Sequence, residues 1–387
     1  MLNYLDTTFW TIIGVVIAFI ALIYAYMVDR NSKKVLRKIL ANTEELKIKA
    51  HNIAKSNPRD TKLKPEEKKI IKDYDRVNVN PKTAEELFLK GFAQYNQGKY
   101  DLAKKYYLQA IEKGDVEAMY DLGILYKNQK KYDLAEKYYL QAIKKGHVMA
   151  MNNLGILYKN QGKYDLAKKY YLRAIEKGHV MAMNNLGLLY DNQEKYDLAE
   201  KYYLQAIEKG YVKAMYNLGL LYKNQEKYDL AEKYWLQAIE KGYVMAMYNL
   251  GLLYKNQEKY DLAEKYWLQA IKKGHVMAMN NLGFLYQEQE KYDLAEKYYL
   301  QAIEKGDIKA MNNLGLLYDN QEKHDLAEKY YLQVIEQGDA EAMYNLGLLY
   351  DNQGKYDLAE KYYLQATEKG YVKAINNLEL LYKERKE

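Results

Sequence analysis

Glycine recurs every 32 residues over most of this chain of 387 residues. The period is followed without a slip by Gly114, Gly146, Gly178, Gly210, Gly242, Gly274, Gly306, Gly338 and Gly370. A fixed repeat of this length means that one supersecondary unit is stacked on copies of itself, and each copy buries its apolar face against its neighbours. Such arrays usually present an extended surface rather than a catalytic pocket. The period therefore predicts a binding scaffold.

The first half of each repeat has the pattern of a helix, named helix A. One copy, residues 214–245, reads AMYNLGLLYKNQEKYDLAEKYWLQAIEKGYVM. Ala214, Leu218 and Leu221 follow helical spacing and define one apolar face. The polar residues 224–226 predict a turn after it.

The second half predicts another helix, named helix B. Asp229, with Glu232 three residues later, has the pattern of an N-cap in a capping box. Lys241 and Gly242 are a cation and a glycine of the kind that favour a helix C-terminus. The side chains expected to point inward from helix B are Leu230, Ala231, Tyr234, Trp235, Ala238 and Ile239.

Small and large apolar residues predict how the helices pack. Gly219 and Ala231 are a pair of small residues that recurs in other copies, and we expect two helices to approach closely there. The rings of Tyr234 and Trp235 are expected to fill the spaces between helical hairpins as core residues. The first and last copies differ: Lys90 replaces leucine, and Glu379 replaces glycine. These changes predict polar ends that keep the array soluble.

The repeat resembles two related families of helical repeats. The residues that resemble the tetratricopeptide repeat (TPR) are Leu218, Gly219, Tyr222, Ala231, Tyr234, Trp235 and Ala238. The usual TPR has 34 residues and often a proline between units, whereas this array has 32 and none. The junction at 174–182, AIEKGHVMA, resembles that of Sel1-like repeats instead, without their longer loop. The resemblance covers residues 84–387. We therefore predict an all-α fold, a right-handed α-solenoid of about nine 32-residue helix-turn-helix repeats plus a C-terminal capping helix, preceded by one transmembrane helix.

The N-terminal segment predicts that transmembrane helix. The stretch Phe9–Val28 is almost wholly apolar, and twenty residues of helix span roughly 30 Å, about the hydrocarbon thickness of a bilayer. A cleaved signal peptide is the alternative, but it requires positive charge before the apolar run and a shorter run. The cationic residues that follow the span are Arg30, Lys33, Lys34, Arg37 and Lys38, and none precedes it. By the positive-inside rule, residues 1–8 lie outside and the array lies in the cytoplasm, at a plasma or bacterial inner membrane.

Residues 29–83 connect this span to the array. Residues 29–57 predict a basic juxtamembrane helix, and its heptad-like positions are Leu36, Ile39, Thr43, Leu46, Ala50 and Ile53. This helix either forms a parallel homodimer or lies on the membrane. Residues 58–83 are charged and hold all three prolines of the chain, Pro58, Pro65 and Pro81, which predicts a linker.

Composition excludes several kinds of function. The net charge is +7, yet residues 86–387 hold 43 Lys and Arg against 42 Asp and Glu, so the array has no electrostatic footprint for nucleic acid. The absence of cysteine removes thiolate catalysis and cysteine-based zinc sites. We also find no nucleophile with a base and an orienting group. We therefore expect no enzymatic activity, no catalytic residue, no cofactor and no metal. Three of the five histidines, His147, His179 and His275, occupy one junction position and are expected to be exposed.

The resemblance implies that helices A line the concave face of the array and bind protein or peptide there. A row of amides able to hold an extended peptide backbone consists of Asn153, Asn185, Asn217, Asn249, Asn281, Asn313 and Asn345. The alternative is that these amides cap or bridge neighbouring helices. Beside them the copies differ, which makes the candidates for specificity Tyr216, Tyr248, Met149, Met181, Met245 and Met277. Lysine and aspartate alternate along the same face without forming a uniform clamp for one carboxylate.

These features predict a membrane-anchored scaffold that binds partner proteins or peptides through the concave face. The anchor, Phe9–Val28, would restrict the partner to the membrane. The competing hypothesis is a structural or assembly protein in which the solenoid packs on copies of itself at the membrane. RNA binding is disfavoured by the near-neutral array.

Overall fold

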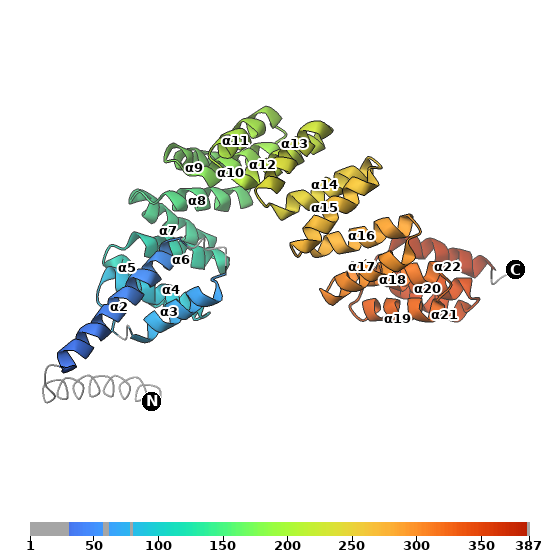
Figure 1. Cartoon of the computed structure of the whole chain (residues 1–387), viewed down its shortest axis with the longest axis horizontal. Helices are drawn as coiled ribbons and strands as arrows, with labels where there is room; N and C mark the ends of the chain where they lie inside the picture. The colour runs from blue at the N-terminus through green and yellow to red at the C-terminus, as the bar shows by residue number, and fades with distance from the viewer. Residues whose placement is uncertain (1–30, 57–61, 78–79, 385–387) are drawn as a thin grey trace. The chain divides into compact units, whose positions relative to one another are not determined.

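A computed structural model describes residues 31–56, 62–77 and 80–384, and those ranges hold 21 helices and no strand (Figure 1). The helices are α2 (Asn31–Ser56), α3 (Pro65–Val77), α4 (Ala84–Asn96), α5 (Tyr100–Glu112), α6 (Val116–Asn128), α7 (Tyr132–Lys144), α8 (Val148–Asn160), α9 (Tyr164–Glu176), α10 (Val180–Asp191), α11 (Tyr196–Glu208), α12 (Val212–Asn224), α13 (Tyr228–Glu240), α14 (Val244–Asn256), α15 (Tyr260–Lys272), α16 (Val276–Glu288), α17 (Tyr292–Glu304), α18 (Ile308–Asn320), α19 (His324–Ile335), α20 (Ala340–Asn352), α21 (Tyr356–Glu368) and α22 (Val372–Glu384).

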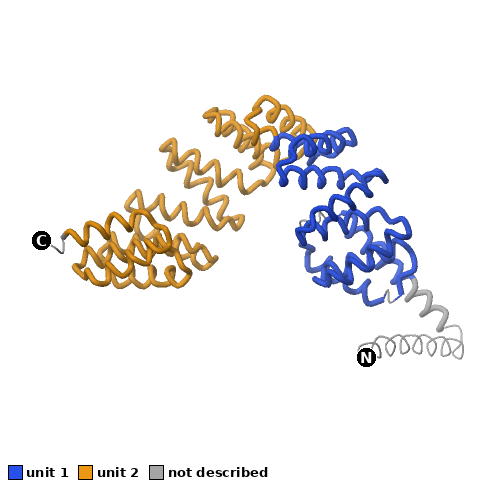
Figure 2. The backbone as a smooth tube through the Cα atoms, turned by 180° about the vertical axis from the view of Figure 1, so that it is seen from behind, with its two compact units in different colours: residues 1–189 blue, residues 190–387 orange. Residues whose placement is uncertain are grey.

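From α4 onward the helices alternate between the two halves of the repeat. Even-numbered helices are helices A and odd-numbered ones are helices B, so nine pairs run from α4/α5 to α20/α21, followed by α22 alone. The predicted nine repeats with a final unpaired helix are therefore confirmed. The chain divides into two compact units, residues 1–189 and residues 190–387 (Figure 2).

Both helices of a repeat end in the same kind of tight turn. At the end of α13, Gly242 has a φ of 79°, and the N–H of Tyr243 donates to the carbonyl of Ala238 at 2.9 Å. This is a Schellman motif, in which the left-handed residue favours glycine. The predicted helix end at Gly242 is confirmed. Most helices A turn in the same way on a residue with a side chain, such as Glu226 with a φ of 60°.

The predicted capping box at Asp229 is wrong. Helix α13 begins one residue earlier, at Tyr228, and its N-cap residue Lys227 makes no side-chain capping bond. The tight turn before it sets the chain into helical conformation too early for Asp229 to cap, so this carboxylate lies in the first turn, where the helix dipole favours it. Glu232 instead accepts a hydrogen bond from the hydroxyl of Tyr254 in the next repeat, at 2.8 Å.

In the repeat α12/α13, as in other paired repeats, the glycine inside helix A makes room for an aromatic ring. A Cβ atom at Gly219 would lie 2.4 Å from Nε1 of Trp235, in helix B of the same repeat. The sequence suggested that Ala231 is the close neighbour of this glycine, but the nearest atoms belong to the tryptophan ring. Ala231 and Trp235 are buried as predicted, whereas Leu230 is 37% exposed and does not point inward.

Tyrosines join one repeat to the next. Tyr254 stacks on Tyr266 of its own repeat, with ring centroids 5.6 Å apart, and its hydroxyl reaches Glu232 of the preceding helix B. Burial, together with the bond to Glu232, raises the pKa of Tyr254 far above its ordinary value. The Nζ atom of Lys259 lies 5.7 Å from the centroid of the same ring. Carboxylate, two rings and a cation thus form one contact that recurs along the array.

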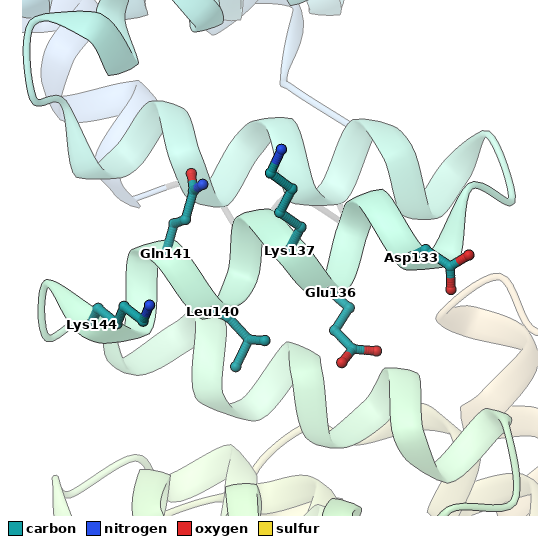
Figure 3. Close-up of a pocket in the computed structure, with 6 residues that line it drawn as sticks. All are labelled: Asp133, Glu136, Lys137, Leu140, Gln141 and Lys144. Carbon is teal, nitrogen blue, oxygen red and sulfur yellow. The ribbon is translucent and has the colours of Figure 1, made fainter.

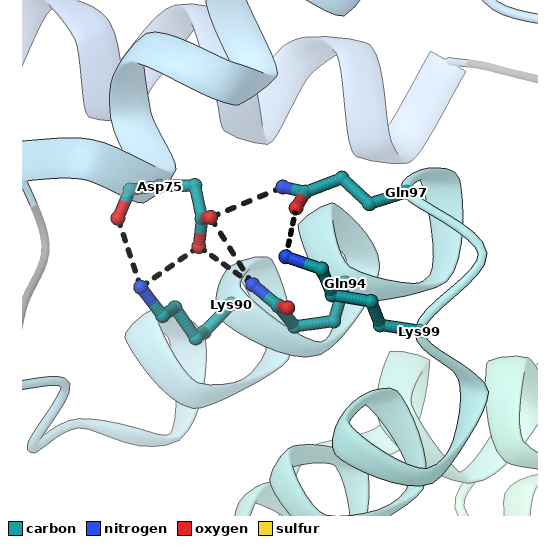
Figure 4. Close-up of polar contacts among 5 residues, drawn as sticks. All are labelled: Asp75, Lys90, Gln94, Gln97 and Lys99. Carbon is teal, nitrogen blue, oxygen red and sulfur yellow. Dashed lines mark hydrogen bonds and ion pairs between the residues drawn. The ribbon is translucent and has the colours of Figure 1, made fainter. Parts of the chain in front are cut away.

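The N-terminal end of the array is covered by α2 and α3. Asp75 of α3 accepts hydrogen bonds from Gln94 at 3.0 and 3.1 Å and from Gln97 at 3.1 Å, and forms an ion pair with Lys90 at 2.8 Å (Figure 4). Within the predicted linker 58–83, residues 65–77 are therefore a helix docked on the first repeat. Lys90 and Gln94 pair with Asp75, rather than serving only to expose polar groups to water.

Helix α2 uses part of its heptad-like pattern within unit 1. Ala50 is fully buried, as is Ala54 one turn later. Glu85 of α4 lies 2.7 Å from Nδ1 of His51 and 3.2 Å from Nζ of Lys47. Since Ala50 packs inside the unit, that position is not open to a second copy of the helix. The homodimer stays a prediction.

Helix α22 exposes apolar side chains because no helix B follows it in the described residues. Val372 is 69% exposed and Leu380 is 54% exposed. Glu379 stands where other helices A have glycine, and it has no aromatic ring of a helix B to accommodate. The predicted polar end is therefore only partly polar.

The predicted transmembrane segment, Phe9–Val28, lies outside the described residues. Among the helices of residues 31–56, 62–77 and 80–384, none is both long and apolar enough to cross a bilayer.

Candidate functional site

One side of each helix A is open to solvent while the rest is buried. In α12, the residues Lys213, Tyr216, Leu220 and Lys223 follow spacings of three and four, so they share one side of the helix. These four are exposed or half-buried. We name this side, with its equivalents in other helices A, the helix A face. Successive helices A contact each other, α4 with α6 in unit 1 and α16 with α18 and α18 with α20 in unit 2, so their faces adjoin within each unit.

The predicted asparagine row bridges successive helices A. In each bridge the side-chain N–H of the asparagine donates to a tyrosine or asparagine 33 residues earlier. The bridges are Asn153 to Tyr120 (3.0 Å), Asn185 to Asn152 (2.9 Å), Asn249 to Tyr216 (3.1 Å), Asn281 to Tyr248 (3.1 Å), Asn313 to Asn280 (2.9 Å), Asn345 to Asn312 (3.1 Å) and Asn377 to Tyr344 (3.3 Å). This accounts for the residue type that alternates beside the row, because both tyrosine and asparagine supply an acceptor oxygen.

The asparagines therefore bridge neighbouring helices, as the alternative prediction stated. These bridges leave fewer amide hydrogens free to bind a ligand. Asn249 uses both its amide hydrogens, one on Tyr216 and one on the carbonyl of Met245 at 2.9 Å. Asn217 is only 8% exposed. Binding of a peptide backbone by this row stays a prediction, and the amides also hold the face together.

Junction residues pair with the junction of the next repeat. Nε2 of His275 lies 3.4 Å from Sδ of Met245, and its ring stacks on Tyr248 with centroids 4.5 Å apart. The side chain of His147 is only 7% exposed, and its Nδ1 accepts from the N–H of Ala150 at 3.1 Å. The expectation of exposed histidines is wrong, because stacking and capping leave all three half-buried. No group of three His, Asp or Glu in the described ranges is placed to hold a metal.

The four predicted methionines fall into two classes. Met181 is 41% exposed and Met277 is 49% exposed, so both present a soft side chain to solvent. Met149 and Met245 are half-buried. Only the first two are available to a partner without rearrangement.

Sequence reasoning missed the apolar position of the helix A face. Phe284 is 39% exposed and Leu316 is 38% exposed, at the position that Leu220 occupies in α12. In the motif Leu-Gly-Leu-Leu-Tyr, the first and last leucines are buried, and only the middle one points outward. The available signal was Phe284 itself, although Phe92, the other aromatic residue at this position among helices A, is buried in α4.

The last residue of the helix A face lies next to the buried aromatic ring of helix B in the same repeat, and in several repeats it accepts a hydrogen bond from that ring. Asp351 accepts from the hydroxyl of Tyr363 at 3.1 Å. Lys223 supplies no acceptor, and there the ring is Trp235, whose Nε1–H donates to the carbonyl of Tyr216 at 3.1 Å. The same rule holds for Gln287 with Tyr299 (2.8 Å) and for Lys255 with Trp267, which donates to Tyr248 (3.2 Å). The pairing of lysine with tryptophan is confined to these two copies, because Lys127 and Lys159 occupy the same position in repeats whose ring is a tyrosine, Tyr139 or Tyr171.

A cluster of carboxylates lies at the first junction of unit 1. Asp115 is the N-cap of α6 and accepts from the N–H of Ala118 at 2.7 Å. Burial raises the pKa of Asp115 to about 6. The negative charges of Glu117 and Asp121 raise the pKa further, whereas the hydrogen bond from Ala118 lowers it. Because the folded pKa exceeds the unfolded value, the carboxyl favours folding when protonated, and this contribution is lost as the pH rises from about 4 to about 6.

We therefore expect Asp115→Asn to stabilise unit 1 at pH 7.5 by about 1 kcal/mol, a value reduced for partial solvent exposure, since the amide still caps the helix. At pH 4 the two proteins should unfold at the same denaturant concentration. The matched control is Asp307→Asn, the same cap on α18, where Lys309 stands in place of an acidic neighbour. Urea unfolding at both pH values measures this. If Asp115→Asn lost as much stability at pH 7.5 as Asp307→Asn does, the prediction for Asp115 would be contradicted.

Helices B present shallow hollows that differ from the helix A face. One hollow is lined by a single helix, α7, through Asp133, Glu136, Lys137, Leu140, Gln141 and Lys144 (Figure 3). It recurs on α11 and α15 with nearly the same residues. Its charges of both signs are repeated from copy to copy, so these hollows offer little to distinguish one partner from another.

Comparison with known proteins agrees with this architecture. A family model described as tetratricopeptide repeat matches residues 88–147, 152–211, 216–274, 248–310, 280–339 and 312–371, which is more than half of the chain. A search of curated proteins found no match. Among solved structures, c5321, a protective antigen of uropathogenic Escherichia coli displaying an SLR fold, is 19% identical, with a TM-score of 0.51 over 91% of this chain and 83% of that one.

Two further structures have weaker similarity. A Sel1 repeat protein from Oxalobacter formigenes is 24% identical and covers 55% of this chain and 98% of its own, with a TM-score of 0.43. Yeast Tom70 is 16% identical and covers 92% of this chain and 75% of its own, with a TM-score of 0.47.

Proposed function

Because the chain belongs to the tetratricopeptide repeat family, we propose that it is a membrane-anchored scaffold that binds an extended segment of a partner protein along its helix A face. The observation that carries this proposal is the contrast between the two surfaces of the repeat. The helix A face varies from copy to copy and exposes Phe284, Leu316 and Met277, whereas the hollows on helices B repeat the same side chains. A surface that selects one partner needs such differences.

Anchoring to the membrane is part of the proposal and rests on the sequence. The apolar run Phe9–Val28 has the length of a bilayer span, and the basic residues after it favour a cytoplasmic array. The anchor would hold the array at the membrane and raise the effective concentration of a partner that is also there. The scaffold itself has no catalytic role in this proposal.

Photo-crosslinking in the cells that make the protein tests which surface binds. A benzoylphenylalanine is placed in the full chain at Phe284 or Leu316 on the helix A face, or at Tyr260 or Leu364 on helices B, which are each 40% exposed. We expect adducts with another protein from the first two positions only. These positions are better than the bridging asparagines, because replacing Asn249 or Asn281 would also weaken the array. Fractionation of the same cells should place the full chain with membranes and a chain lacking residues 1–30 in the soluble fraction.

The outcomes separate the proposal from its competitor. Adducts from Tyr260 and Leu364 alone would move the binding surface to helices B and overturn the proposal. Adducts of the chain with itself would favour the structural or assembly role, for which the exposed apolar residues Val372 and Leu380 of α22 are the supporting observation. A full chain found only in the soluble fraction would overturn the anchor.

A further inference from the structure

The last position of the helix A face carries a row of charges in unit 2 whose sign depends on the repeat. In chain order the row, named the charge row, is Asp191, Lys223, Lys255, Gln287, Asp319, Asp351 and Lys383. From α12 to α20, two cations (Lys223 and Lys255) are thus followed by a neutral residue and then by two anions (Asp319 and Asp351). We name these pairs the cationic and the anionic block, and together they span five repeats. Beyond them the sign of the charge reverses, to Asp191 at one end and Lys383 at the other.

The side chains of the two blocks are accessible but only partly neutralised within the protein. Lys223 is exposed. The side chain of Lys255 is 25% exposed, forms an ion pair with Glu288 at 3.0 Å and lies 4.7 Å from the ring centroid of Phe284. The side chain of Asp319 is 18% exposed, and Nδ1 of His324 lies 3.4 Å from its carboxylate. Burial raises the pKa of Asp319 in spite of His324, so its carboxylate would gain from a further cation.

Between the blocks the face is apolar. Phe284 comes from α16, the helix between Lys255 and Asp319, and Leu316 comes from α18, one turn before Asp319 on the same helix. Met277, 49% exposed, comes from the same helix as Phe284. The neutral Gln287 lies beside them. The centre of the face in unit 2 therefore offers apolar contact where the charge row has no charge.

The opposite edge of the face does not repeat this order. In the same repeats that edge carries Lys213, Met245, Met277, Lys309 and Glu341. Its positive and negative charges are not separated along the array, so only the charge row has a cationic end and an anionic end. A partner that recognises this order of charges must therefore lie along the charge row.

The spacing of the helices sets the length of a matching segment. Packed helices lie about 8 to 10 Å apart, and an extended chain advances about 3.3 Å per residue. One repeat thus corresponds to about three residues, and the four steps from Lys223 to Asp351 correspond to roughly twelve residues. An extended segment of this length can place charged ends on both blocks at once.

We infer that the segment bound by unit 2 is an extended stretch of a partner protein, with acidic residues at one end, apolar residues in the middle and basic residues at the other end. The acidic end lies on Lys223 and Lys255, the apolar middle on Phe284 and Leu316, and the basic end on Asp319 and Asp351. Complementary charge favours encounter and fixes the register of the bound segment. This inference rests on the proposed function and specifies the partner's chemistry.

Three synthetic peptides of about twelve residues test the inference, the length taken from helix and strand spacing. The block peptide has two glutamates, a leucine- and phenylalanine-containing middle and two lysines, in that order. The interleaved peptide has the same composition with the charges alternating. The basic peptide has lysine at both ends. Fluorescence anisotropy measures their binding to the full chain in neutral detergent micelles at low and high salt. We expect the block peptide to bind about tenfold more tightly than the interleaved one, with a preference that salt reduces.

Reversing one half of the row provides a sharper comparison. In Lys223→Glu/Lys255→Glu both blocks are acidic, so the block peptide should lose about tenfold in affinity and the basic peptide should become the best ligand. The matched control, Lys233→Glu/Lys265→Glu, makes the same charge change at exposed positions of helices B and should alter none of the three affinities. If the first variant does not fold by circular dichroism, Asp319→Lys/Asp351→Lys replaces it, with preference then shifting to a peptide with glutamate at both ends.

Equal binding of block and interleaved peptides, no binding of the block peptide, or unchanged preference in a folded half-reversed variant would each overturn the inference. The photo-crosslinks from Phe284 and Leu316 are independent of these peptides. If those crosslinks form while the peptide preference fails, the proposed function stands and only the partner's charge pattern is wrong. If the crosslinks form elsewhere, the proposed function itself fails.

Discussion

Replacing Gly219 by alanine is expected to lower the free energy of unfolding of unit 2 by about 2 to 3 kcal/mol. The added methyl would lie 2.4 Å from Nε1 and 2.5 Å from Cδ1 of Trp235, far inside van der Waals contact. The ring has little freedom to move, because it is 1% exposed and its N–H is bonded to the carbonyl of Tyr216. Alanine alone would favour the helix slightly, so the loss measures overpacking and not helix propensity.

Hydrogen exchange of α12 and α13 is the appropriate measurement, because an array of repeats need not unfold in one step. The double variant Gly219→Ala/Trp235→Leu tests whether the loss comes from the clash with the tryptophan ring. Its loss in free energy of unfolding should be smaller than the sum of the losses of the two single variants. The control is Glu379→Ala in α22, at the same position of the repeat, where Glu379 is exposed and stability should change by less than about 0.5 kcal/mol. Wild-type protection of α12 and α13 in Gly219→Ala would show that this packing is not as tight as the structure indicates.

Replacing Asp75 by alanine is expected to detach α3 from the first repeat. The carboxylate is the shared acceptor for Lys90, Gln94 and Gln97, and Gln94 is only 5% exposed. Without it the ammonium of Lys90 would keep its hydrogen bond to the backbone carbonyl of residue 75 but lose its ion pair, and the buried amide of Gln94 would lose its charged acceptor. We expect a cost of about 2 to 3 kcal/mol, below the value for fully buried pairs because the side chains of Lys90 and Asp75 are 12% and 16% exposed.

Limited proteolysis of residues 57–83 and hydrogen exchange of α3 measure this detachment. Arg76→Ala is the matched control, since Arg76 is adjacent, its side chain is 68% exposed, and its distance to Asp73 is 3.8 Å. Such an exposed pair contributes at most about 1 kcal/mol. If Asp75→Ala and Arg76→Ala are cleaved at the same rate as the wild type, α3 is not held by this network. The array beyond α5 should keep its protection in both variants, because each repeat contacts mainly its neighbours.

The candidate site was predictable in outline and not in detail. The asparagines were found because they recur at one position, yet their hydrogen bonds to Tyr216 and Tyr248 depend on the distance between successive helices A. The exposed Phe284 and Leu316 were missed because a leucine-rich motif does not tell which leucine faces solvent. The burial of His147 was missed because its ring stacks on a tyrosine from the preceding repeat.

The sequence by itself determined the repeat, its two helices, the number of copies and the membership in a family of helical repeats. The physical reason is that periodic apolar residues and regularly placed glycines act locally and recur in every copy. Only the tertiary structure decided that Asp229 does not cap, that Gly219 makes room for Trp235, and that residues 65–77 pack on the first repeat. These depend on contacts between residues that lie in different helices, whose distances no spacing in the sequence specifies.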